Sequence, residues 1–110
     1  MKKANVYYKG RLAARLTESE DGFTFQYDEA YLAQTDAKAV SLTLPLQSAP
    51  YQSEVLFPFF DGLIPEGWLL DIAQENWKIN IRDRMSLLMA CCKDCIGAVS
   101  IVEDKEENHG

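Results

Sequence analysis

The chain has 110 residues, of which 47% are hydrophobic and 25% are charged. This size and composition are typical of one compact globular domain and exclude a chain of two domains. A domain of this length can bury a hydrophobic core but has little room for a deep catalytic cleft as well. These limits favour a small binding module over an enzyme.

Eleven basic and seventeen acidic side chains give a formal net charge of −6, whereas binding to a phosphate backbone depends on clustered Lys and Arg. The charge argues against direct nucleic-acid binding. No segment approaches the ~20 apolar residues of a membrane span, and the polar start of the chain does not fit a signal peptide. We therefore expect a cytoplasmic protein with no membrane contact.

The start of the chain predicts an antiparallel meander of three strands. Residues 5–8 and 11–16 flank the Lys9-Gly10 turn, which is typical of a hairpin. Residues 23–27 then alternate apolar and polar side chains, as a half-buried strand does. Asp28 follows as the predicted cap of a short helical turn.

The next segment predicts one more strand, a loop and a helical turn. Residues 39–44 alternate again, and Pro45 ends this predicted strand. We expect a loop over residues 47–53 and a helical turn over residues 53–57.

The second half of the chain predicts two helices and a returning strand. Pro65 opens a helix that extends to about Lys78, and Asn80, with Asp83 three residues later, caps another that reaches about Cys92. Residues 97–102 predict the last strand. The expected fold is α+β: a small antiparallel sheet, made of the N-terminal meander and the C-terminal strand, with a helical middle section.

We expect a single domain over residues 1–102 and an acidic, flexible tail over residues 103–110.

No catalytic, cofactor or metal site is expected. The single histidine, His109, lies beside the C-terminus, and no glycine-rich phosphate loop is present. Cys91, Cys92 and Cys95 lack a fourth zinc ligand other than His109. Helical spacing predicts instead that one of them joins an apolar stripe: Met85, Leu88, Met89 and Cys92. A small redox or metal enzyme that uses the cysteines stays open as an alternative.

Trp68 is out of place in the predicted helix that follows Pro65. Five apolar residues fall on one broad face of that helix: Leu69, Leu70, Ile72, Ala73 and Trp77. Trp68 lies roughly 130° from the centre of this face, beside Asp71 and Glu75. Two interpretations remain: the indole folds back onto Phe59 or Phe60, or it anchors a partner protein, since Trp is enriched among binding hot spots.

Three segments together resemble a known family. They read SLTLPL over residues 41–46, FFDGLIPEG over residues 59–67 and KDCIGAV over residues 93–99. The chain resembles, over essentially its whole length, the N-terminal subdomain of HipA-like serine/threonine kinases of bacterial toxin–antitoxin modules, which implies that subdomain's fold. The resemblance does not include the kinase body that binds ATP and magnesium, so kinase activity is not implied.

A free-standing copy of this subdomain is similar to the HipS-like proteins of HipBST modules. The resemblance implies a non-enzymatic antitoxin that inhibits a HipA-like (HipT-like) kinase, with a HipB-like helix-turn-helix protein as a further partner and the only link to DNA. The predicted protein-binding residues, with Trp68 near the kinase active site, are Ile64, Pro65, Glu66, Gly67, Trp68 and Asp71. The alternative is a detached subdomain that a split HipA-like kinase requires for activity.

Overall fold

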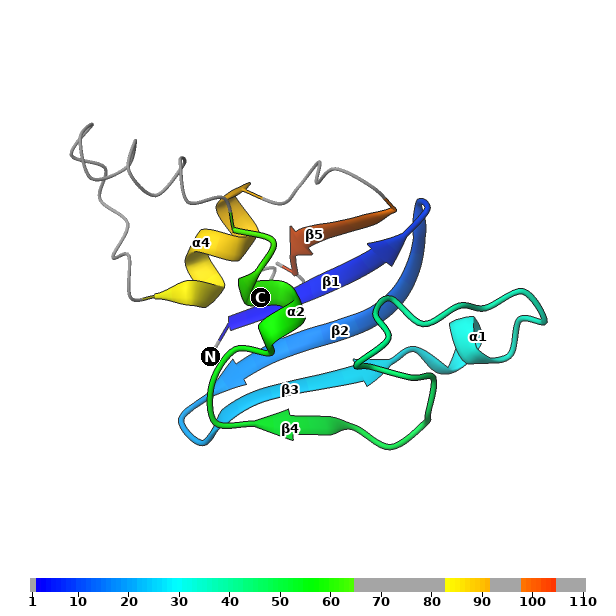
Figure 1. Cartoon of the computed structure of the whole chain (residues 1–110), viewed down its shortest axis with the longest axis horizontal. Helices are drawn as coiled ribbons and strands as arrows, with labels where there is room; N and C mark the ends of the chain where they lie inside the picture. The colour runs from blue at the N-terminus through cyan, green and yellow to red at the C-terminus, as the bar shows by residue number, and fades with distance from the viewer. Residues whose placement is uncertain (1, 65–82, 92–97, 105–110) are drawn as a thin grey trace, which may run out of the picture.

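The computed structural model describes residues 2–64, 83–91 and 98–104. They form a five-stranded antiparallel sheet in the order β4-β3-β2-β1-β5, with short helices beside it (Figure 1). The strands are β1 (Lys2–Tyr8), β2 (Arg11–Ser19), β3 (Gly22–Tyr27), β4 (Tyr51–Ser53) and β5 (Val99–Glu103). The helices are α1 (Glu29–Leu32), α2 (Pro58–Asp61) and α4 (Arg84–Cys91). The predicted α+β class with a small antiparallel sheet is confirmed.

The predicted meander and returning strand are both present. Lys9 (φ 52°) and Gly10 (φ 82°) form the turn between β1 and β2, and two residues with positive φ match the right-handed twist of a hairpin. β5 pairs antiparallel with β1 and ends at Glu103, which lies opposite Ala4. Glu103 therefore belongs to the sheet rather than to the predicted tail, whose residues 105–110 lie outside the described residues.

The predicted strand over residues 39–44 is wrong. This segment is a loop with a single bridge between Ser41 and Leu44. The amide of Leu44 donates to the Ser41 carbonyl (3.0 Å), and the amide of Thr43 donates to Ser41 Oγ (3.2 Å). Such local bonds from serine compete with strand pairing, so the backbone turns back on itself here.

The segment predicted as a loop over residues 47–53 contains β4, which is too short to give an alternation signal. Tyr51 lies opposite Phe25 of β3 in the register. The predicted helical turn over residues 53–57 is also wrong, because Phe57 is extended (ψ 135°) and α2 begins at Pro58. A proline restricts the residue before it to extended backbone and is favoured in the first helical turn.

Helix α4 begins later than predicted. Its start is set by Asp83, whose carboxylate accepts the Ser86 amide (3.2 Å) and the Ser86 hydroxyl (2.8 Å). The predicted capping residue Asn80 lies outside the described residues. Met85, Leu88 and Met89 are buried, which confirms the predicted apolar stripe as far as it is described.

The core lies on one face of the sheet. Alternate residues of the strands point into it, and all of the following are buried: Ala4, Val6, Ala14, Leu16, Phe25, Tyr27 and Ile101. α2, α4 and the loop after α1 contribute further core residues, including Val40, Leu44 and Phe60. In the described part of the chain, every helix is too short or too polar to cross a membrane.

Candidate functional site

Of the predicted binding residues, the structure describes only Ile64. Ile64 is 5% exposed and belongs to the core cluster. It therefore fixes the start of the predicted segment to the core and is not exposed for contact with a partner. Pro65, Glu66, Gly67, Trp68 and Asp71 lie outside the described residues. The two interpretations of Trp68 both stay predictions.

Helix α2, which leads into this segment, is fixed to the core on two sides. The Phe60 ring is fully buried, and its centroid lies 5.4 Å from that of Phe25 in β3. On the other side, Arg84 Nε donates to Asp61 Oδ1 at 2.6 Å, which joins α2 to α4. The start of the predicted binding segment is therefore held in place on the face of the sheet that carries the core.

A second segment on this face is held in place by tyrosine hydroxyls. It is the loop of residues 38–46, which we call the clamped loop. The Tyr31 hydroxyl donates to the Lys38 carbonyl (2.6 Å) and accepts the Lys38 amide (3.0 Å). The Tyr27 hydroxyl accepts the Val40 amide (3.0 Å) and donates to the Leu44 carbonyl. Both ends of the turn between Val40 and Leu44 are thus bound to the side chain of Tyr27, which is distant in sequence.

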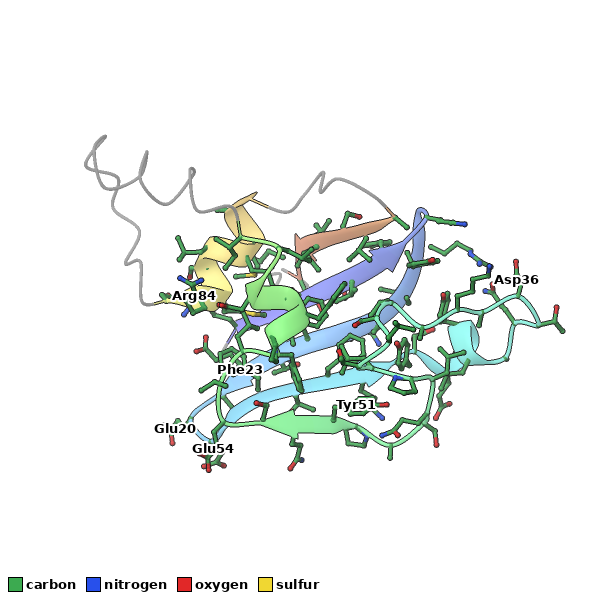
Figure 2. All side chains as sticks on the ribbon, viewed as in Figure 1. Glu20, Phe23, Asp36, Tyr51, Glu54 and Arg84 are labelled. Atoms are coloured by element: carbon green, nitrogen blue, oxygen red, sulfur yellow. The ribbon has the colours of Figure 1, made fainter. Side chains whose placement is uncertain are left out.

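The far end of the clamped loop has a further hydrogen bond. The Tyr51 hydroxyl donates to the Pro45 carbonyl at 2.6 Å, and Figure 2 shows the labelled Tyr51 beside the loop that returns from α1. Burial raises the pKa of Tyr27 to about 12, so its hydroxyl stays protonated at neutral pH and keeps its donated bond. The hydrogen bond from Tyr27 to the Leu44 carbonyl is therefore expected to persist at neutral pH.

Replacing Tyr27 with phenylalanine should lower the free energy of unfolding by about 1 to 3 kcal/mol, because the Val40 amide and the Leu44 carbonyl lose a partner inside the protein. Urea unfolding of Tyr27→Phe measures this. Tyr51→Phe is the matched control: its hydroxyl bonds an exposed carbonyl that water can reach, and it should cost less than about 1 kcal/mol. Equal losses in both variants would contradict the clamping role of Tyr27.

Leu42 is the most exposed large apolar side chain of the clamped loop. Leu42 is 99% exposed, although Val40 (7%) and Leu44 (3%) on either side of it are buried. In the sequence, this segment served as a predicted strand and as part of the family resemblance, and Leu42 was not identified as an exposed residue. The alternation could not reveal this, because it places Leu42 on the same face as its two buried neighbours.

Tyr27, which holds the clamped loop, and Phe60 of α2 both lie against the Phe25 ring. The Phe25 centroid lies 4.9 Å from that of Tyr27, whose hydroxyl holds the loop, and 5.4 Å from that of Phe60. Figure 1 shows α2 and the loop after α1 on the same side of the sheet.

The charged pairs of the sheet secure α4 to β1 and β2. Lys2 Nζ lies 3.2 Å from Asp83 and 3.7 Å from Glu18. The hydrogen bond to Asp83 raises the pKa of Lys2. Burial opposes ionisation of Asp83, but its bonds from Ser86 and Lys2 outweigh this and lower its pKa. Lys2 pairs with two carboxylates, and Asp83 also caps α4, so these charges stabilise the fold.

Among residues 2–64, 83–91 and 98–104, no group of three or more His, Cys, Asp and Glu side chains is placed to hold a metal ion. Cys92, Cys95 and His109 lie outside those ranges. The expectation of no metal site stays a prediction.

Comparison with known families identifies the domain. A family model described as the HipA N-terminal domain matches residues 4–102. The chain belongs to the HipA N-terminal domain family. The resemblance seen in the sequence is thereby confirmed.

A solved structure of the N-terminal domain of HipA toxin has the same fold, with a TM-score of 0.75 and 25% sequence identity, covering 96% of this chain and 95% of that one. An uncharacterized protein of Haemophilus influenzae is 31% identical over 106 residues, which are 96% of each chain. A putative kinase, Y4mE, of Sinorhizobium fredii is 27% identical over 104 residues, 94% of this chain but 25% of the kinase. The match thus spans a quarter of one relative and nearly all of another.

Proposed function

We propose that the chain is a non-enzymatic antitoxin that binds and inhibits a HipA-like (HipT-like) serine/threonine kinase. The observation that carries the proposal is the family match over residues 4–102. In the Sinorhizobium putative kinase, the matching domain accompanies three further quarters of the chain. The Haemophilus relative is a protein that matches over 96% of its own length. The matching region thus occurs within a putative kinase and also as nearly all of another protein. Such a region is suited to bind the body of a related kinase as a separate protein.

The mechanism we propose is steric or conformational. Trp68 would contact the kinase near its active site, together with Pro65, Glu66, Gly67 and Asp71. Ile64 is buried and fixes the start of this segment to the core. A bound protein shifts a kinase towards an inactive arrangement only by its difference in affinity for the two states. The site of action is the cytoplasm, and a HipB-like helix-turn-helix protein would connect the complex to DNA.

The second candidate function is the opposite one. The chain would be the detached subdomain that a split HipA-like kinase needs for activity. The Sinorhizobium putative kinase favours this candidate, because it carries the domain within its own chain.

Co-expression with the HipA-like kinase encoded beside this chain separates the two candidates by host growth. Restored growth is expected for an antitoxin, and deeper arrest would support the split kinase. Trp68→Ala should weaken kinase binding by roughly 30-fold or more, the usual cost of truncating a hot-spot Trp. Trp68→Phe keeps an aromatic ring and should retain most of the affinity. If Trp68→Ala folds and neutralises with unchanged potency, the anchor role is wrong.

A further inference from the structure

We draw no further inference here: the strongest candidate, the face of the sheet opposite the core, where Asn5 of β1 has a buried Oδ1 with no hydrogen-bond partner among the described residues, carries no proposal because nothing in the structure shows what covers that face.

Discussion

Replacing Phe25 with alanine is expected to lower the free energy of unfolding by about 3 to 5 kcal/mol, as for other large buried aromatic residues. The Phe25 ring is fully buried, and its centroid lies within 4.9 to 6.3 Å of four other rings. These rings are Tyr27 of β3, Tyr51 of β4, Phe57 immediately before α2 and Phe60 of α2. The substitution would leave a cavity between the sheet and α2. Urea unfolding measures the loss.

Phe23→Ala is the matched control, two residues earlier on the same strand. Phe23 is only partly buried and packs at the margin of the core. Because the cost follows the apolar area removed from water, this variant should lose about half as much stability or less. Equal losses at the two positions would show that the Phe25 ring is not the centre of the aromatic cluster.

Replacing Gly22 with alanine is expected to cost at least about 3 kcal/mol. Gly22 has φ 128°, a conformation that side chains rarely adopt, and such a residue alone costs about 1 to 3 kcal/mol. In addition, a Cβ at this position would lie 2.4 Å from the Ser53 carbonyl oxygen and 3.0 Å from the Glu54 Cα. The turn between β2 and β3 and the end of β4 would have to separate.

Gly10→Ala isolates the conformational part of this cost. Gly10 also has a positive φ, 82°, but a Cβ there meets nothing within 4 Å. It should cost about 1 to 2 kcal/mol, the price of a left-handed non-glycine residue. Thermal or urea unfolding of the two variants makes the comparison. If Gly22→Ala cost no more than Gly10→Ala, the close approach of β4 to this turn would be wrong.

Local patterns in the sequence predicted the sheet well where partners are neighbours in the chain. The Lys9-Gly10 turn and period-two alternation identified β1, β2 and β3, since hairpin pairing depends on a short turn and on side chains that alternate between two faces. Helical spacing likewise identified the buried stripe of α4. β4 was missed because three residues are too few to show alternation, and its pairing with β3 is non-local.

By itself, then, the sequence determined the α+β class and the family, and it predicted the segment that begins at Ile64 as a candidate contact. Only the tertiary structure decided the conformation around Leu42. In a strand, Val40, Leu42 and Leu44 would lie on one face, whereas the structure buries the first and third and exposes the second. The reason is that the Tyr27 hydroxyl, 13 and 17 residues away, accepts the Val40 amide and donates to the Leu44 carbonyl, which satisfies the backbone of a turn instead of a strand ladder.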